Sequence, residues 1–188
     1  MLKNRRVVDA VILAWTTATA LIPAGYCSTT AHPMIVSSIN IRANPTLVWK
    51  TIRDPALRKC FHREVISSQD HKFVVKDTFP GIPVIGSTTC VFNEVEEPFE
   101  RVEFALVKSD RLKQFEGAWV LTPINGGKET NLQLSAFCDC GINLPFARCL
   151  TNTTVHRFMN AELAETKETA ESLQEKDNEP RAVVEARQ

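Results

Sequence analysis

Six runs of alternating apolar and polar residues lie between His62 and Cys140, and they constrain the fold more than any other feature of the chain. They read REVISSQ, KFVVKDTF, PVIGSTTCVFNEV, FERVEFALVK, KQFEGAWVLTP and ETNLQLSAFCDC. Short turn-forming segments, among them Gln-Asp-His, Glu-Glu-Pro and Asn-Gly-Gly, separate one run from the next. Alternation of period two at hairpin spacing is typical of an antiparallel meander. The sequence therefore predicts six consecutive antiparallel strands.

The segment before these runs predicts one further strand and two short helices. Residues 34–43 place Ile35, Ile39 and Ile41 on one face of a strand. Asn44 followed by Pro45 is a helix start signal, because Asn caps a helix N-terminus and Pro suits its first turn. We expect a helix over residues 45–54 and a second short helix over residues 55–61.

A long helix is expected to close the chain. From Leu144-Pro145 onward no residue breaks a helix until Pro180, which predicts a helix of about 30 residues, longer than the usual 8 to 20. The predicted order is one strand, two short helices, six strands and one long helix.

This order resembles the START-like, or SRPBCC, superfamily, which includes the Bet v 1-like, polyketide cyclase/dehydrase and lipid transport proteins. Two stretches carry the resemblance, Ala43-Asn44-Pro45 followed by Val48-Trp49, Ile52 and Asp54, and later Trp119, Pro123, Gly127 and Thr130. It covers residues 34 to about 173 and is closer to the cyclase and lipid-transport branches than to the plant allergens. The resemblance implies an α+β helix-grip fold, in which a curved seven-stranded antiparallel sheet (β-α-α-β6-α) surrounds a long C-terminal helix and leaves a cavity between them.

The inner wall of such a cavity can be assigned from the alternation. Phe115, Gly117 and Trp119 share one face of their strand, which is aromatic and aliphatic. The residues expected to line a ligand cavity are Phe104, Leu106, Phe115, Trp119, Leu134, Leu150, Thr154 and Ala161. The small residues on the closing helix, Ala161 among them, either leave room for a ligand or pack closely against the sheet.

The apolar loop FPGIPVIGS, residues 79–87, is expected at the cavity mouth with Ile82, Val84 and Ile85. Exposed apolar residues are costly unless something covers them. The loop is either a lid, an edge that touches a membrane transiently, or a segment folded onto the core.

Asp77 is the one weak candidate for a catalytic residue. It alternates with Phe73, Val75 and Phe79, so it is either a buried carboxylate with a raised pKa or a cation partner, or the frayed end of a strand. Cys138 and Cys140 do not have the usual ligand spacing of a zinc site. We expect neither a metal nor a cofactor.

The N-terminus has the order of a secretory signal. Basic residues at Lys3, Arg5 and Arg6 precede the uncharged run AVILAWTTATALI and a small polar spacer. We expect residues 1–31 to be a signal peptide that sends the protein to the periplasm or outside the cell, or alternatively an anchor through residues 7–26. Removal of the leader leaves five cysteines, an odd number that cannot pair completely within one chain.

Composition is compatible with one domain over residues 32–176 and an acidic, disordered tail over residues 177–188. Hydrophobic residues make up 44% of the chain, and 22 basic residues balance 22 acidic ones, so charge gives no reason to expect nucleic acid as a partner. The leading hypothesis is a monomeric, exported protein that holds a small hydrophobic or lipid-like ligand. The alternatives are a polyketide cyclase/dehydratase-like enzyme, a lyase that uses the same cavity, and an adaptor or chaperone-like interaction domain.

Overall fold

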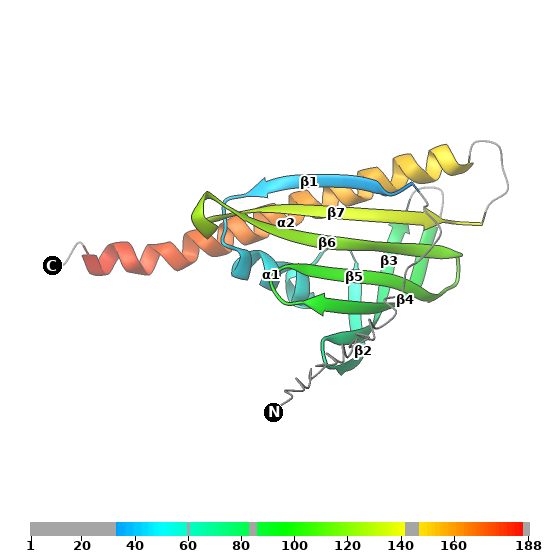
Figure 1. Cartoon of the computed structure of the whole chain (residues 1–188), viewed down its shortest axis with the longest axis horizontal. Helices are drawn as coiled ribbons and strands as arrows, with labels where there is room; N and C mark the ends of the chain where they lie inside the picture. Colours follow the sequence, from blue (N-terminus) through cyan, green and yellow to red (C-terminus); the bar gives the residue numbers. More distant parts are fainter. Residues whose placement is uncertain (1–32, 60, 83–85, 142–146, 186–188) are drawn as a thin grey trace, which may run out of the picture. The chain divides into compact units, whose positions relative to one another are not determined.

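The computed structural model describes residues 33–59, 61–82, 86–141 and 147–185. Within these residues the elements follow the order β1 (Ile35–Ile41), α1 (Pro45–Arg53), η1 (Pro55–Leu57), β2 (His62–Gln69), β3 (Lys72–Ile82), β4 (Gly86–Glu97), β5 (Arg101–Ser109), β6 (Gln114–Ile124), η2 (Asn125–Gly127), β7 (Glu129–Asp139) and α2 (Ala147–Glu185). Figure 1 shows the sheet with α2 running behind it. The leader, the loop residues Val84 and Ile85, and the start expected for the closing helix lie outside the described residues.

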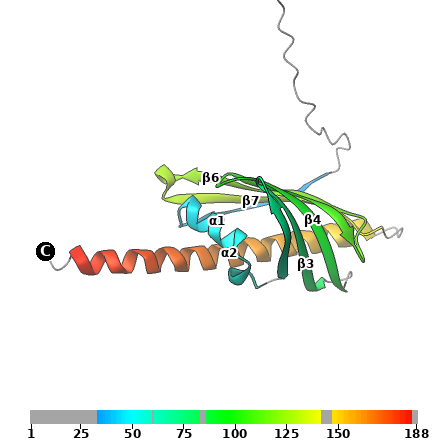
Figure 2. The ribbon, with the colours of Figure 1, turned by 90° about the horizontal axis from the view of Figure 1, so that it is seen from below.

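The seven strands form one antiparallel sheet in the order β1-β7-β6-β5-β4-β3-β2. The predicted meander and the helix-grip α+β fold are thus confirmed, and the structure adds that the first strand pairs with the last. Figure 2 shows β3 and β4 curving toward α2, so that the helix lies along the concave face. The register shifts at Ile66 of β2 and at Val107 of β5, each an extra residue opposite two consecutive residues of the neighbouring strand, and again near the end of β3 between Phe79 and Ile82.

Helix α1 begins as its sequence predicts. The Asn44 side chain accepts a hydrogen bond from the Leu47 backbone N–H at 3.0 Å, and Pro45 occupies the first turn. The second short helix was expected over residues 55–61, but the structure has only the 3₁₀ turn η1. Asp54 caps this turn through the Ala56 backbone N–H at 2.9 Å, and Arg58 already has extended backbone angles.

Helix α2 is longer than expected, with 39 residues. It includes Pro180, since a proline removes only its own N–H donor and kinks or weakens a helix without always ending it. The helix therefore continues through residues 177–185, which the sequence assigned to a disordered tail.

The face of α2 that packs on the sheet also differs from the prediction. Ala161 and Ala164 are exposed, whereas Val155, Met159 and Leu163 are buried. Alanine is a good helix former at any degree of burial, so it says little about which face is inside. The larger side chains decide the orientation, and Ala161 does not line a cavity.

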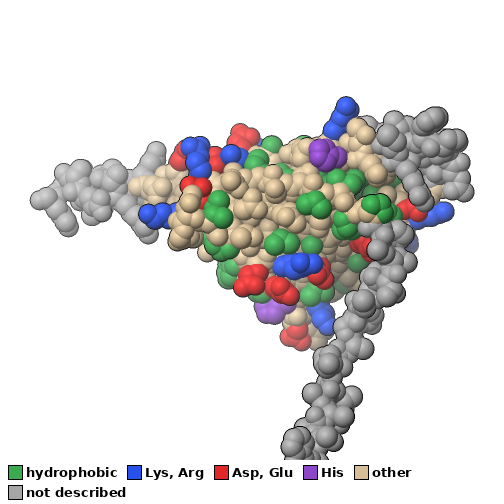
Figure 3. All heavy atoms as spheres, turned by 45° about the horizontal axis from the view of Figure 1, so that its top comes forward, with side chains coloured by type: hydrophobic (Ala, Val, Ile, Leu, Met, Phe, Trp, Pro, Cys, Tyr) green, Lys and Arg blue, Asp and Glu red, His purple; other side chains and the backbone are tan. Residues whose placement is uncertain are grey.

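The opposite face of the sheet mixes small polar residues with exposed valines, such as Val36 and Val95. Ser38 and Asn40 on β1 point outward and are exposed, and the Asn131 side-chain amide on β7 donates to Asn40 Oδ1 at 2.7 Å. Figure 3 shows this face, with Lys, Arg, Asp and Glu mostly toward its edges. None of the described helices is long and apolar enough to cross a membrane.

Candidate functional site

A cavity of about 50 Å³ lies between the concave face of the sheet and α2. Its lining includes members of the two hydrophobic clusters of the domain, one that contains Leu134 and Met159 and one that contains Phe79 and Phe92. The full lining is Arg58, Phe61, Arg63, Asp77, Phe79, Phe92, Glu94, Phe104, Phe115, Trp119, Leu134, Ala136, Phe158, Met159 and Glu162. The cavity therefore combines aromatic walls with five ionisable side chains.

Three phenylalanines from neighbouring strands form the aromatic wall. The rings of Phe92, Phe104 and Phe115 meet edge to face, with centroids 5.6 to 5.9 Å apart. Phe104 lies opposite Gly117 in the register, and a Cβ on that glycine would come within 2.6 Å of the Phe104 ring and 2.0 Å of the Ser135 carbonyl oxygen. Only glycine lets the Phe104 ring lie against the strand, which shapes this wall.

Arg58 brings a guanidinium group to the helix side of the cavity. Its side chain is 7% exposed and forms an ion pair with Glu162 of α2. The group also lies over two aromatic rings, 4.5 Å from the centroid of Phe61 and 5.4 Å from that of Trp119. Burial lowers the pKa of Arg58 and the Glu162 carboxylate opposes this shift, but an arginine keeps its proton in a protein.

A second ionic cluster lies on the sheet side. Arg63 on β2 donates to both oxygens of Asp77 on β3, at 2.8 Å from Nε and 2.7 Å from Nη2, and it also pairs with Glu94 on β4 at 2.9 Å. Arg53 at the end of α1 pairs with Glu94 at 2.6 Å and with Glu96. In this cluster three carboxylates face two guanidinium groups, so negative charge is in excess.

Burial changes the acidities of two carboxyl groups in this cluster, and the negative charge of Glu94 adds to the change. Burial raises the pKa of Asp77, which is 2% exposed, and the bonds from Arg63 only partly offset the shift. The pKa of Glu96 is likewise raised by burial against the opposing charge of Arg53. Burial disfavours the charge on Arg63, but Asp77 and Glu94 outweigh it and raise the pKa of Arg63.

The structure brings together about half of the predicted lining residues. Phe104, Phe115, Trp119 and Leu134 line the cavity, and Asp77 is a buried carboxylate with a cation partner rather than a frayed strand end. Thr154 is buried and Leu106 packs against the second hydrophobic cluster, but neither borders the cavity.

Four other residues predicted to line the cavity or its mouth have side chains outside the described part of the structure. Leu150 belongs to α2 and Ile82 to the end of β3, but the placement of their side chains is not described, and Val84 and Ile85 lie outside the described residues.

Sequence reasoning missed the ionic groups Arg58, Arg63, Glu94 and Glu162. Glu162 is the first of eight acidic residues between position 162 and the end of the chain, a pattern typical of a solvated segment, yet it is 3% exposed. A signal was available in the spacing, because Val155, Met159, Glu162 and Thr166 recur at three and four residues and so share one helix face. Arg63 and Glu94 occupy inward positions of alternating strands. Charged residues are usually expected on the outer face, so these two were not considered as lining residues.

The cysteines and histidines do not contribute a metal centre among the residues that the structure describes, since no group of three or more His, Cys, Asp or Glu side chains could hold an ion there. Cys90, Cys138 and Cys140 are free thiols. Burial raises the pKa of Cys90 and Cys138, and Cys140 lies 3.6 Å from the Thr151 hydroxyl. Cys90 and Cys138 are therefore protonated and of low nucleophilicity.

Solved structures similar to this chain share its fold. TTHA0849, a protein from Thermus thermophilus, is 17% identical with a TM-score of 0.65, over 75% of this chain and 99% of its own. The Zhui aromatase/cyclase from Streptomyces sp. R1128 is 16% identical with a TM-score of 0.64, over 74% of this chain and 93% of its own. A START superfamily protein from Mycobacterium smegmatis is 14% identical with a TM-score of 0.57, over 76% of this chain and 97% of its own. A search of curated protein sequences gives no significant match.

The family itself is identified from the sequence pattern of the whole domain. The model of the family described as polyketide cyclase / dehydrase and lipid transport matches residues 32–171, which include every strand and most of α2. With the helix-grip fold and its relatives in the START/Bet v 1-like superfamily, this match shows that the chain belongs to the polyketide cyclase / dehydrase and lipid transport family.

Proposed function

We propose that the protein binds a small, largely apolar molecule with one oxygen-bearing end in the cavity between the sheet and α2. The observation that supports this most is the placement of paired guanidinium and carboxylate groups inside an otherwise aromatic cavity. Apolar walls with a few converging polar groups are typical of small-molecule sites, where the walls supply affinity and the polar groups fix orientation. The aromatic wall fits the body of the ligand, and Arg58 fits its oxygen.

Filling the cavity tests this proposal. Ala136 on β7 lines the cavity and is 1% exposed, so Ala136→Val adds two methyl groups to the empty space on a strand that favours β-branched residues. We expect the variant to melt at the same temperature as the wild type or higher, while binding of 2-naphthoate, measured by isothermal titration calorimetry, weakens at least tenfold. Ala105→Val is the matched control, because Ala105 is exposed on the outer face of β5. Equal weakening in both variants, or none in either, would refute a ligand site in this cavity.

A second candidate function is a cyclase or dehydratase, and the ionisable lining favours it over a purely passive carrier. A carrier cavity can be almost wholly apolar, whereas ring closure or loss of water from a polyketide-like substrate needs a group that moves protons and a cation that stabilises an enolate oxygen. Asp77, whose pKa is raised, fits the first role and Arg58 the second. The aromatase/cyclase activity in the name of the Streptomyces relative points to the same chemistry.

The carrier and the enzyme differ in what happens to the bound molecule. Native mass spectrometry of the purified protein identifies a ligand that co-purifies with it, and incubation of protein with the hydrated or open-chain form of that ligand follows its conversion. An enzyme would release a product lighter by one water, at a rate that falls at least tenfold in Asp77→Asn. A carrier would return the ligand unchanged, which would refute the catalytic candidate and leave the binding proposal intact.

Export of the protein is a further part of the proposal, and the sequence of residues 1–31 is its only support. We propose that residues 1–31 direct the chain across a membrane and are removed, because basic, apolar and small polar residues follow one another there. N-terminal sequencing of the protein recovered outside the cytoplasm should begin near His32. Recovery of soluble protein that retains Met1 would contradict it.

A further inference from the structure

The cavity is too small for the ligand that the proposed function requires. About 50 Å³ compares with roughly 300 to 1,000 Å³ for ordinary small-molecule sites, and an engineered cavity of about 150 Å³ holds a single benzene ring. One wall must therefore move when a ligand enters. The question is which wall can move without loss of backbone hydrogen bonds.

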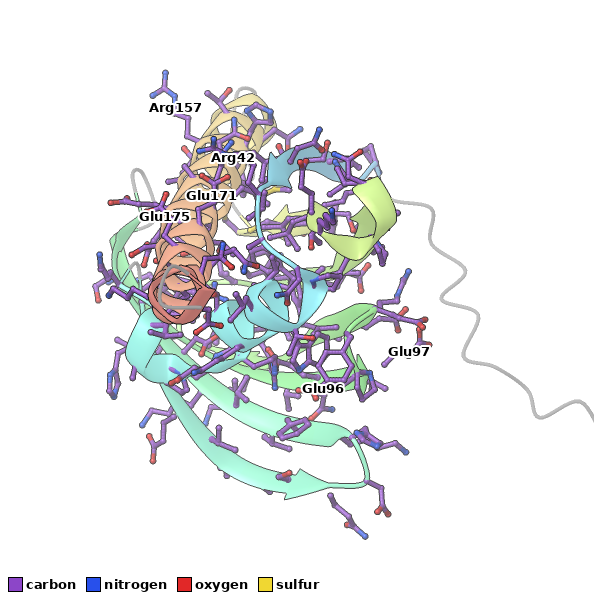
Figure 4. The ribbon with its side chains drawn as sticks, turned by 90° about the vertical axis from the view of Figure 1, so that its left-hand side faces the viewer. Arg42, Glu96, Glu97, Arg157, Glu171 and Glu175 are labelled. Atoms are coloured by element: carbon purple, nitrogen blue, oxygen red, sulfur yellow. The ribbon has the colours of Figure 1, made fainter. Side chains whose placement is uncertain are left out.

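The sheet and the distal half of α2 are firmly held. The strands that carry the aromatic wall pair with their neighbours in one sheet, and the β6–β7 ladder runs without interruption from Gln114 to Ile124. Helix α2 is fastened to the end of β1 by Arg42, whose backbone N–H donates to Glu171 at 2.9 Å and whose guanidinium pairs with the same residue at 3.2 Å. In Figure 4 Arg42 and Glu171 point toward one another, whereas Arg157 points away from the domain. Gln174 adds a bond to the Asn44 side chain at 3.0 Å.

The segment from Asp54 to Lys59, here called the strap, is held differently. Its own backbone bonds are local, since Leu57 N–H donates to the Asp54 carbonyl and Arg58 N–H to the Pro55 carbonyl, so they move with it. Two contacts join the described part of the strap to α2, namely the Arg58–Glu162 ion pair and the bond from Lys59 N–H to Glu165 at 2.6 Å. Both are interactions with carboxylates that another anion or water could replace.

We propose that the strap is the entrance to the cavity, that the Arg58–Glu162 ion pair latches it to α2, and that the ligand which opens it carries an anionic oxygen that takes the place of Glu162 at Arg58. This inference rests on the proposed function and adds to it the route of entry and the charge of the ligand. Arg58 is well placed to exchange Glu162 for a ligand oxygen, because a guanidinium has five N–H donors. Among the described residues, Glu162 and the Ile52 carbonyl accept hydrogen bonds from Arg58, the latter at 3.0 Å. The rings of Phe61 and Trp119 against it would contact an aromatic body next to that oxygen.

Two probes of equal shape separate charge from hydrophobicity. 2-Naphthoate carries the anionic oxygen, and 2-naphthalenemethanol is its neutral counterpart. In Glu162→Gln the latch is weakened and the competing carboxylate is gone, so we expect the affinity for naphthoate to rise about tenfold while that for the alcohol changes less than twofold. Glu171→Gln is the matched control, since it removes a carboxylate that ties α2 to an arginine away from the cavity, and it should leave both affinities unchanged.

A double variant keeps the test valid if Glu162→Gln does not fold. Replacing both members of a buried ion pair by apolar residues is commonly neutral or stabilising, so Arg58→Met with Glu162→Leu should remain folded. We expect it to bind the alcohol with an association rate about tenfold above wild type, because the latch is absent, and to lose any preference for naphthoate. Equal effects of Glu162→Gln on both probes would overturn the exchange of Glu162 for an anionic oxygen at Arg58, and an unchanged association rate in the double variant would overturn the latch; either result leaves the binding site standing. If neither probe binds to the wild type or to any variant, the proposed function itself is overturned.

Discussion

Two isosteric substitutions in the sheet-side ionic cluster should have opposite consequences. Glu94 accepts from both arginines, at 2.6 Å from Arg53 and 2.9 Å from Arg63, so Glu94→Gln breaks two buried ion pairs at once, whereas Asp77 pairs with Arg63 alone. Loss of one partner from a buried ion pair costs about 3 to 5 kcal/mol, and we expect the free energy of unfolding at pH 7 to fall by this amount.

Asp77→Asn removes the carboxylate that the cluster has in excess. Arg63 keeps Glu94, the charges of the cluster become equal, and an amide resembles the protonated acid that burial already favours. The free energy of unfolding at pH 7 should change by less than about 1 kcal/mol, the net value of one hydrogen bond. A cost equal to that of Glu94→Gln would refute the view that Asp77 is the surplus charge.

The pH dependence gives an independent check on Asp77. Because its pKa in the folded protein is raised above the ordinary value of 3.8, the native state holds this proton at pH values where the unfolded chain has lost it. Wild-type stability from this group is therefore present below pH 3.8 and is lost as the pH rises through the folded-state pKa. Urea unfolding at a series of pH values should show this decline in the wild type and not in Asp77→Asn. A decline of equal size in both proteins would assign it to another group.

Two further substitutions test the packing of the cavity walls. Trp119→Ala should lower the free energy of unfolding by about 3 kcal/mol, the low end for a large aromatic residue, because Trp119 is only partly buried; an unchanged urea midpoint would mean that its ring does not pack on the inner face. Gly117→Ala should cost about 3 kcal/mol or more, since its Cβ would meet the Ser135 carbonyl oxygen at 2.0 Å. A melting temperature equal to that of the wild type would show that the Phe104 wall can shift away.

The sequence was sufficient for the sheet because strand alternation and turn chemistry act over a few residues. Phe115 and Trp119 lie on the inner face as their spacing predicts, and Asn44 caps α1. These features depend on local geometry that each segment carries in its own residues. They also carry the family resemblance, which the family match over residues 32–171 confirms.

The polar part of the site could not be predicted in the same way. The pairing of Arg58 with Glu162 joins residues 104 positions apart, and it depends on the rotation of α2 about its axis. Alanines and threonines on every side of that helix left the rotation open, so Ala161 was expected inside, whereas the structure buries Glu162 beside it. The alternation of its strand made Asp77 a weak candidate with two open interpretations, and its partner Arg63 is fixed only by the register of β2 against β3.

The most direct test of the binding site uses the methionine methyl groups of the protein. The chain has three methionines, of which Met159 lines the cavity at 1% exposure and Met34 is 41% exposed before β1. Nuclear magnetic resonance of protein labelled with ¹³C at the methionine methyls, titrated with 2-naphthoate, reports on both sites at once, because an aromatic ring shifts a methyl signal that it contacts. If the ligand binds between the sheet and α2, the Met159 signal shifts saturably while the Met34 signal stays in place. Movement of Met34 alone, or of neither signal at saturating probe, would contradict a ligand site between the sheet and α2.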